Sequence, residues 1–254
     1  PCFFLPAMQN AVAPRHLARF DVVDTNGLLP VSMARGRAFY SAYLFRRFLQ
    51  NQLAPCLQER PSEAPLAKLA FARAKLPRAV TQRYPALHKK DFDNLDALVA
   101  SLPIDQHVAP VASVPGGHVA GREELAAFMS KRYARYAEGR SHPDDDAASG
   151  LSPWLHFGHL GAHEMLAAVC KKEKWDAVPR GTSRDGRRDQ FWGLSASGEA
   201  FLEEFITFRE LSFNTAANMP NFESYDALPE WARRTLEQHQ ADERPFLYEL
   251  DTLE

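Results

Sequence analysis

The segment that decides the fold is DDDAASGLSPWLHFGHLGAHEM, residues 144–165. Ser152 followed by Pro153 predicts the start of a helix, because serine can cap a helix and proline suits its first turn. The free N–H groups of a helix start attract anions. Ser149 and Ser152 add hydroxyl donors, and Gly150 lets a ligand come close to the backbone. On spacing alone the segment is either an ordinary capped helix or a phosphate site.

Helical periodicity dominates the chain from Gly121 onward. In GREELAAFMSKRYARYAE, residues 121–138, five apolar side chains fall on one side of a helix; these are Leu125, Phe128, Met129, Tyr133 and Tyr136. Three more segments have helical spacing, at residues 161–175, 197–216 and 228–242. The pattern predicts a mainly α domain over residues 118–254.

The region before this domain has two parts. FDVVDTNGLLPV, residues 20–31, has the alternation and the Asn-Gly turn of a short strand. We therefore interpret residues 1–37 as the remnant of an α/β domain. Residues 38–56 have helical spacing and open a helical linker that extends to residue 117. Within this linker the sequence predicts short helices at residues 63–76 and 91–102.

The hydrophobic content and the net charge of the chain indicate which class of protein it belongs to. The 254 residues are 45% hydrophobic and carry a net charge of −2, which is typical of a globular protein without an overall basic field. Only the segment 171–190 is locally basic, with seven basic and four acidic side chains.

The three cysteines are far apart, which indicates a reducing, cytoplasmic setting. No apolar run approaches the ~20 residues of a membrane span. The chain lacks an initiator Met and breaks off as a helix begins, so we expect a piece of a longer protein.

Five separated segments, in matching order, resemble the DNA photolyase/cryptochrome superfamily. SGLSPWLHFGHLGAHE is similar to the flavin-phosphate segment of that superfamily, T-S-x-L-S-P-x-L-x-F-G, and RYAEGRSHPDDDAASGLSP places a tyrosine upstream as the family does. WGLS, FLEEFITFRELSFNTA and YDALPEWARRTLEQHQADERPFLYEL are similar to class II photolyases and their bacterial relatives. Weaker similarity extends through VVDTNGLLPV and FRRFL.

The resemblance implies a fold and an activity. The fold is the N-terminal part of a helical FAD-binding photolyase domain, preceded by the linker and the antenna-domain remnant. The activity is light-dependent DNA repair, in which reduced FAD passes an electron to a cyclobutane pyrimidine dimer that is flipped out of UV-damaged DNA. A cytoplasmic monomer is expected, with FAD as its cofactor and no metal.

Family roles carry over to matching positions of this chain. The expected FAD-binding residues are Tyr136, Ser149, Gly150, Leu151, Ser152 and Asn214. Glu204 matches the carboxylate that contacts the lesion bases, Asn214 lies near the flavin ring, and both are candidates for the catalytic step. Phe208, where relatives often carry Trp, packs against flavin or lesion. Helical spacing puts Glu204, Phe208 and Leu211 on one face.

Other expected contacts lie in the basic segment. Arg184, Arg187 and Arg188 are candidate contacts to DNA phosphates, beside Trp175 or Trp192; a solvated surface loop is an equal alternative. Two positions depart from the family pattern. Ala148 replaces a common threonine and removes a hydroxyl from the phosphate site, and Phe208 lacks the indole N–H and is a poorer electron donor.

Three other functions fit parts of the sequence. His156, His159 and His163 would share one face of an unbroken helix and could bind zinc, although two glycines interrupt the segment. A cryptochrome-like protein would bind FAD without repairing DNA. A flavin-free helical remnant would do neither.

Overall fold

The computed structural model describes residues 11, 21, 23–62, 64–70 and 75–253. In this part of the chain the regular elements are all helical. The α-helices are α2 (Ala42–Gln58), α3 (Arg78–Arg83), α4 (Leu95–Ala100), α5 (His118–Ala127), α6 (Tyr136–Gly139), α7 (Ser152–His156), α8 (Ala162–Glu173), α9 (Ala196–Leu202), α10 (Arg209–Asn218), α11 (Glu230–Gln238) and α12 (Leu250–Leu253). The 3₁₀ turns are η2 (Val31–Ala34), η3 (Lys89–Phe92), η5 (Tyr133–Arg135), η6 (Pro143–Asp145) and η8 (Tyr225–Ala227), and the π-helical segments are η4 (Phe128–Arg132) and η7 (Glu203–Phe208).

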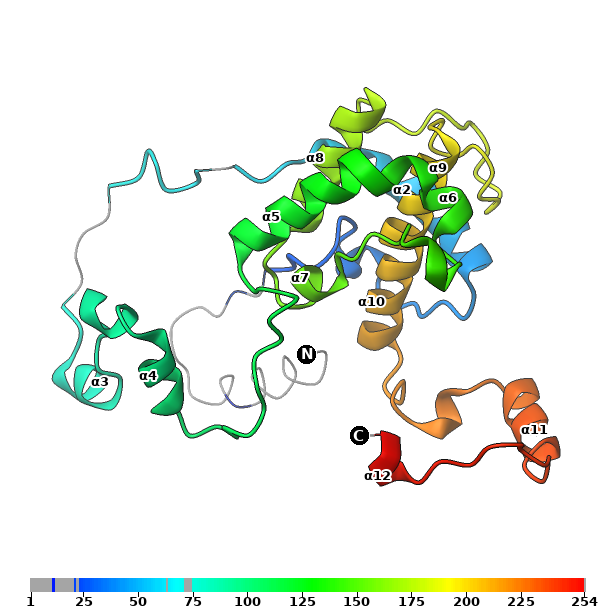
Figure 1. Ribbon diagram of the computed structural model, residues 1–254. Helices are drawn as coiled ribbons and strands as arrows, with labels where there is room; N and C mark the ends of the chain where they lie inside the picture. The colour runs from blue at the N-terminus through cyan, green and yellow to red at the C-terminus, as the bar shows by residue number, and fades with distance from the viewer. Residues whose placement is uncertain (1–10, 12–20, 22, 63, 71–74, 254) are drawn as a thin grey trace.

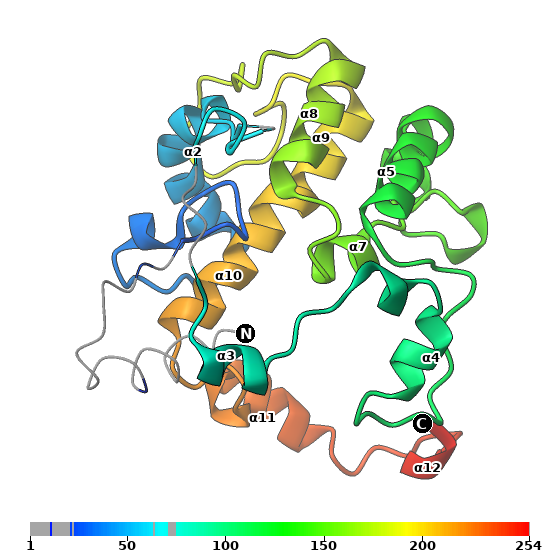
Figure 2. The ribbon, with the colours of Figure 1, turned by 90° about the vertical axis from the view of Figure 1, so that its left-hand side faces the viewer.

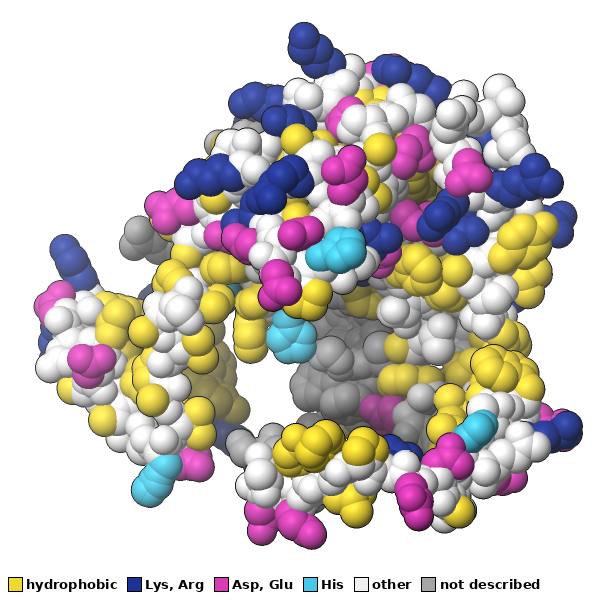
Figure 3. Space-filling view, turned by 45° about the vertical axis from the view of Figure 1, so that its right-hand side comes forward, with side chains coloured by type: hydrophobic (Ala, Val, Ile, Leu, Met, Phe, Trp, Pro, Cys, Tyr) yellow, Lys and Arg dark blue, Asp and Glu magenta, His cyan; other side chains and the backbone are white. Residues whose placement is uncertain are grey.

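One helical body holds the hydrophobic core (Figure 1). In it η2 packs on α10, α2 packs on η7, and α6 packs on α9. The outlying helices α3, α4 and α11 contain no buried residue. Figure 2 shows α3, α4, α11 and α12 away from α2, α8 and α9, and Figure 3 shows hydrophobic side chains on the surface of these outlying segments. Among the described helices, none has the length and apolar character that a bilayer crossing requires.

A nearly continuous helical rod made of α9, η7 and α10 forms the centre of the body (Figure 1). It begins where the Ser195 side chain caps α9 by accepting the N–H of Gly198 at 3.1 Å. Leu202 and Ile206 are fully buried in the rod. The sequence predicted a helix over residues 197–216, which is confirmed, but not the π-helical turn within it.

The helix predicted at residues 38–56 is confirmed as α2. Ser41 caps it by accepting the N–H of Leu44 at 3.3 Å. Its buried apolar residues recur every four positions, at Phe45, Leu49, Leu53 and Leu57. A regular apolar spacing of this kind in the sequence predicts a helix with one buried face.

The strand predicted at residues 20–31 is wrong over residues 21 and 23–31, which form no strand; residues 20 and 22 lie outside the described part. Side chains satisfy two of the backbone donors here. The N–H of Leu28 donates to the Glu210 carboxylate at 2.7 Å, and that of Val31 donates to the Asp24 carboxylate at 2.9 Å. A strand neighbour is therefore not needed for these groups.

The two predicted linker helices have different outcomes. The described residues 64–70 and 75–76 of the first are not helical. The second is confirmed as α4, which Asn94 caps by accepting the N–H of Ala97 at 3.0 Å. Most of the predicted antenna-domain remnant, residues 1–37, lies outside the described residues, so that domain boundary stays a prediction.

Candidate functional site

A cavity of about 500 Å³ lies between α6, the start of α7 and η7. Its lining consists of Tyr136, Arg140, Ala148, Ser149, Gly150, Ser152, Pro153 and Glu204. The serine-rich helix start and the Glu204 carboxylate, far apart in sequence, therefore share one cavity. Four of the six predicted FAD-binding residues line it; Leu151 and Asn214 do not.

The helix start at Ser152 is confirmed, with Pro153 in the first turn of α7. The capping role of Ser152 is wrong, because the helix already includes Ser152. Leu151 holds the position before the helix, and α7 has no side-chain cap. Leu151 is fully buried, whereas Ser152 is exposed. The Ser152 hydroxyl on the cavity wall is therefore not used in a cap.

The loop before α7 is held close to the body by backbone and side-chain contacts. Gly139 allows the close approach, since a Cβ there would lie 2.6 Å from the Cβ of Ala147. The guanidinium of Arg132 pairs with Glu124 and donates to the carbonyl of Ser149 at 3.0 Å. Gly150 has a φ of 69°, a conformation that disfavours any side chain. These contacts fix the loop that carries the serines.

Tyr136 forms one wall of the cavity and is anchored by aromatic packing. Its ring meets the rings of Phe128 and Phe201 edge-on, with centroids 5.7 and 5.4 Å apart. Burial raises the pKa of the Tyr136 hydroxyl, so the group stays protonated and remains a hydrogen-bond donor at neutral pH.

Arg140 is a cavity residue that the sequence interpretation missed. Its Nη1 donates to the Glu204 carboxylate at 2.6 Å, and its guanidinium lies over the Tyr136 ring at 5.8 Å. The signal was in the sequence, because Arg140 follows Tyr136 by four residues and so lies on the same side of a helix. The pair orients the Glu204 carboxylate within the cavity.

The three residues predicted to share one helical face, Glu204, Phe208 and Leu211, have different surroundings. Glu204 lines the cavity, Phe208 is 42% exposed elsewhere, and Leu211 packs against the core. The three residues span η7, a π-helical segment with i→i+5 hydrogen bonds, and the start of α10.

Asn214 is buried, and both the oxygen and the nitrogen of its side-chain amide form hydrogen bonds. It accepts the N–H of Phe39 at 3.1 Å and donates to the carbonyl of Arg37 at 3.0 Å. In this structure Asn214 joins α10 to the segment before α2. Its expected place beside a flavin ring stays a prediction, and the structure does not bring it to the cavity.

The basic segment is anchored on α2 rather than on the cavity. Arg184 donates to the carbonyls of Gly181 and Ser183 at 2.6 and 3.0 Å. Arg187 and Arg188 are exposed and form ion pairs with the neighbouring Asp185 and Asp189, at 3.5 and 3.6 Å. Two tryptophans considered beside them, Trp175 and Trp192, are buried in the core and so are not surface partners for DNA.

The histidine triplet does not share a helix. α7 ends at His156 and α8 begins at Ala162, so the three rings are not on one continuous helical face. The His159 Nδ1 instead accepts the N–H of Gly117 at 3.0 Å. Over the residues that the structure describes, no group of three metal-ligating side chains is found.

The donors around the cavity fit the diphosphate part of a flavin nucleotide. Hydroxyl groups come from Tyr136, Ser149 and Ser152, a guanidinium comes from Arg140, and Gly150 lines the cavity without a side chain. Uncharged hydroxyls, a backbone approach and one cation are the groups that proteins commonly use for phosphate oxygens. The cavity residues do not by themselves form a pocket for the ring system.

Comparison with known proteins finds sequence similarity to curated deoxyribodipyrimidine photo-lyases. It is 31% identical over 237 residues to the deoxyribodipyrimidine photo-lyase of Oryza sativa subsp. japonica, covering 91% of this chain and 40% of that protein. The photo-lyases of Arabidopsis thaliana and Potorous tridactylus are 30% and 26% identical, over 91% and 97% of this chain, and 42% and 40% of their own lengths. The chain thus spans about 40% of the length of these relatives. No protein-family model matches it.

Proposed function

We propose that this chain, which belongs to the DNA photolyase/cryptochrome superfamily, supplies the flavin-phosphate site and the lesion-facing carboxylate of a class II type photolyase. The proposed activity is light-dependent splitting of cyclobutane pyrimidine dimers in UV-damaged DNA, with reduced FAD as electron donor. The proposed setting is a cytoplasmic monomer. The observation that carries the proposal is the cavity shared by Ser149, Ser152 and Glu204.

The roles of the residues follow from their chemistry. FAD, when bound and reduced, supplies an electron on illumination. The hydroxyls of Tyr136, Ser149 and Ser152 donate hydrogen bonds to phosphate oxygens, and Gly150 leaves room for them. Glu204 accepts hydrogen bonds from the exposed edges of the flipped bases, as flipped bases are commonly recognised. Arg140 positions Glu204 through the 2.6 Å contact.

Replacing the cavity glycine tests the flavin-phosphate site. We expect Gly150→Val to weaken FAD binding by roughly tenfold or more, because one lost ligand hydrogen bond to a charged group already has about this effect. Binding is measured by flavin absorbance retained after gel filtration of the refolded chain with added FAD, and by titration of flavin fluorescence.

Gly158→Val is the matched control for this variant. Gly158 has nearly the same φ, 70° against 69°, and open space around it, but it does not line the cavity. Both variants introduce similar backbone strain, and a Cβ at Gly150 would in addition lie 3.2 Å from the Glu124 carboxylate. We expect only Gly150→Val to lose FAD. Equal loss in the two variants would mean that strain, and not the cavity, controls binding. The double variant Ser149→Ala/Ser152→Ala adds a test without backbone strain.

Glu204→Gln tests the lesion contact. In the gene product that contains this chain, we expect the variant to keep its flavin and to lose roughly tenfold in light-dependent repair, because a charged acceptor is replaced by a neutral one. Repair is followed as the loss of dimers from UV-treated oligonucleotides in light and in darkness. Arg135→Gln, an exposed change outside the cavity lining, serves as control.

The same assays separate the alternatives. Bound FAD with no light-dependent loss of dimers in the unmodified protein would favour a cryptochrome-like flavoprotein. No retained flavin would favour a flavin-free remnant. Repair that proceeds equally in darkness would refute the proposed electron transfer.

A further inference from the structure

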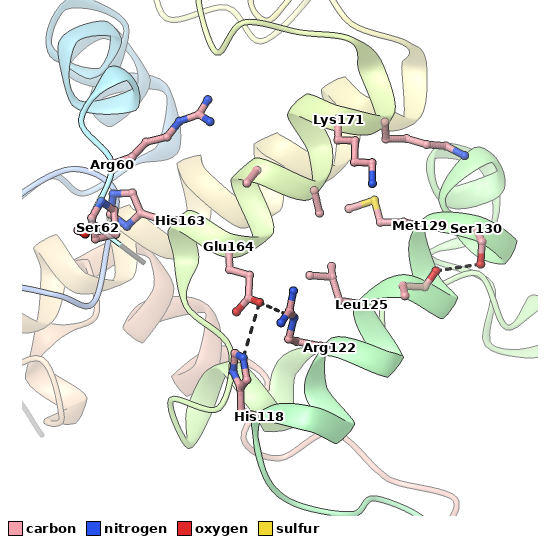
Figure 4. A pocket seen from close by; sticks show the side chains of 15 residues that line it. Arg60, Ser62, His118, Arg122, Leu125, Met129, Ser130, His163, Glu164 and Lys171 are labelled. Carbon is pink, nitrogen blue, oxygen red and sulfur yellow. Dashed lines mark hydrogen bonds and ion pairs between the residues drawn. The ribbon is translucent and has the colours of Figure 1, made fainter. Parts of the chain in front are cut away.

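A second and larger cavity, of about 1080 Å³, lies along α8 between α5 and the segment around Arg60 (Figure 4). It shares no lining residue with the cavity at Glu204. The side chains of Leu125 from α5, of Met129 from the following η4, and of Glu164 and Lys171 from α8 face the space between these helices (Figure 4). The proposed flavin-phosphate site makes no use of this cavity.

At one end of the cavity, a negative side chain is paired with a positive one. The Glu164 carboxylate forms an ion pair with the Arg122 guanidinium at 3.0 Å and lies 3.9 Å from Nε2 of His118 (Figure 4). The carboxylate of Glu164 therefore already has a cationic partner in Arg122, and it has little free charge to offer a ligand cation.

The other end carries cations without such partners. Lys171 and Lys172 line the cavity at the last turn of α8, and neither forms an ion pair with a carboxylate of the described residues. Arg60, across α8, adds positive charge. Burial and then this guanidinium lower the pKa of His163, which keeps that ring neutral at neutral pH. The side chains that line the cavity therefore have a net positive charge.

The wall between the two ends is apolar. Leu125 is buried and Met129 is partly buried, while Ala126, Ala167 and Ala168 leave space because their side chains are short. The flexible thioether of methionine adapts to flat rings and makes favourable contacts with them. An apolar wall with a small number of charged groups at one end is typical of a small-molecule site.

We propose that the cavity between α5 and α8 binds a small aromatic anion, with its ring on Leu125 and Met129 and its acidic group on Lys171 and Lys172. Carboxylates, sulfonates and phosphate monoesters share this chemistry. The two lysines act as point charges that accept any of these groups, and the ring contact distinguishes the ligand from a free inorganic anion.

The experiment uses 1-naphthyl phosphate as the probe and isothermal titration of the full chain as the measurement. We expect the probe to bind at least tenfold more tightly than either 1-naphthol or inorganic phosphate, because each of these lacks one of the two contacts. Lys171→Glu should weaken binding by roughly tenfold or more. Ala167→Trp, at an exposed helical position, should fill the cavity and weaken binding to a similar extent.

Two controls locate the binding site. Lys131→Glu makes the same charge change at an exposed position outside the cavity lining, and should leave the affinity unchanged. Ser152→Trp fills the cavity at Glu204 and should also leave it unchanged, which keeps this test independent of the proposed flavin site. The proposal is overturned if the probe does not bind, if 1-naphthol binds equally well, or if Lys131→Glu and Lys171→Glu weaken binding alike.

Discussion

Raising the pH from about 5 to about 8 is expected to destabilise the protein by about 3 kcal/mol through Glu210 alone. Burial raises the pKa of Glu210 from 4.5 to about 7, against the opposing effect of the Leu28 N–H and the Arg209 guanidinium. Between these two values the folded state binds more protons than the unfolded state. Stability is therefore fully present below about pH 4.5 and is lost as the pH rises through about 7.

The geometry explains why the charged form is costly. The nearest cationic atom, Arg209 Nη1, is 3.7 Å from the carboxylate and has no hydrogen-bond partner of its own. Asp24, on the facing segment, repels the charge. Gly27 packs directly on the carboxylate, since a Cβ there would lie 2.1 Å from Oε2. Water is thereby excluded from a group that needs it when ionised.

Glu210→Gln isolates this contribution. The amide stays neutral at every pH and can still accept the Leu28 N–H, so the variant should match the unmodified protein near pH 5 and exceed its unfolding free energy by about 3 kcal/mol near pH 8. Urea unfolding across this pH range measures the difference. Glu237→Gln, on exposed α11, is the control. Parallel pH profiles for Glu210→Gln and the unmodified protein would contradict the assignment.

Arg46→Met is expected to lower the free energy of unfolding by about 3–5 kcal/mol, the usual cost of removing one partner of a buried ion pair. The Arg46 guanidinium donates to the Glu203 carboxylate at 3.0 and 2.6 Å and to the carbonyl of Gly186 at 2.7 Å. Both side chains are largely buried, with 12% and 9% of their surfaces exposed. The methionine fills the same space but leaves the carboxylate without a cation.

Two variants separate this effect from ordinary loss of packing. Arg47→Met, at the next and exposed position of α2, should change stability little. Arg46→Met/Glu203→Gln should recover a large part of the loss, because the orphaned charge is removed. Urea unfolding provides the free energies. Equal losses in Arg46→Met and the double variant would show that the carboxylate is not what makes the substitution costly.

The sequence predicted those elements whose hydrophobic spacing is regular. α8 and α11 lie within their predicted ranges, and α2 overlaps its range but ends two residues later, because each repeats apolar or polar residues at helical intervals. The segment at residues 20–31 has an equally regular alternation, yet its backbone donors at Leu28 and Val31 bond to carboxylates instead of a neighbouring strand. A local pattern cannot indicate that a partner 182 residues away will satisfy a backbone group.

The residues of the candidate site that lie in the family motifs could be predicted from the sequence. The resemblance identified Tyr136, the two serines, Gly150 and Glu204, and the structure brings these together. It did not identify Arg140, whose role depends on contact with a helix 64 residues later. The π-helical segment η7, which contains Glu204 and Phe208, was also missed, because a π turn depends on tertiary packing and not on local propensity.

The long-range contacts of α10 have a consequence for biosynthesis. Leu28 and Phe39 find their partners on α10 only after 182 and 175 further residues have been made. At ribosomal speeds this delay is roughly 10 to 40 s. During most of that time the apolar face of α2, including Phe45, Leu49 and Leu53, also lacks η7, the segment on which α2 packs in the folded protein. The apolar face of α2 is therefore a segment of the nascent chain to which a chaperone can bind early in synthesis.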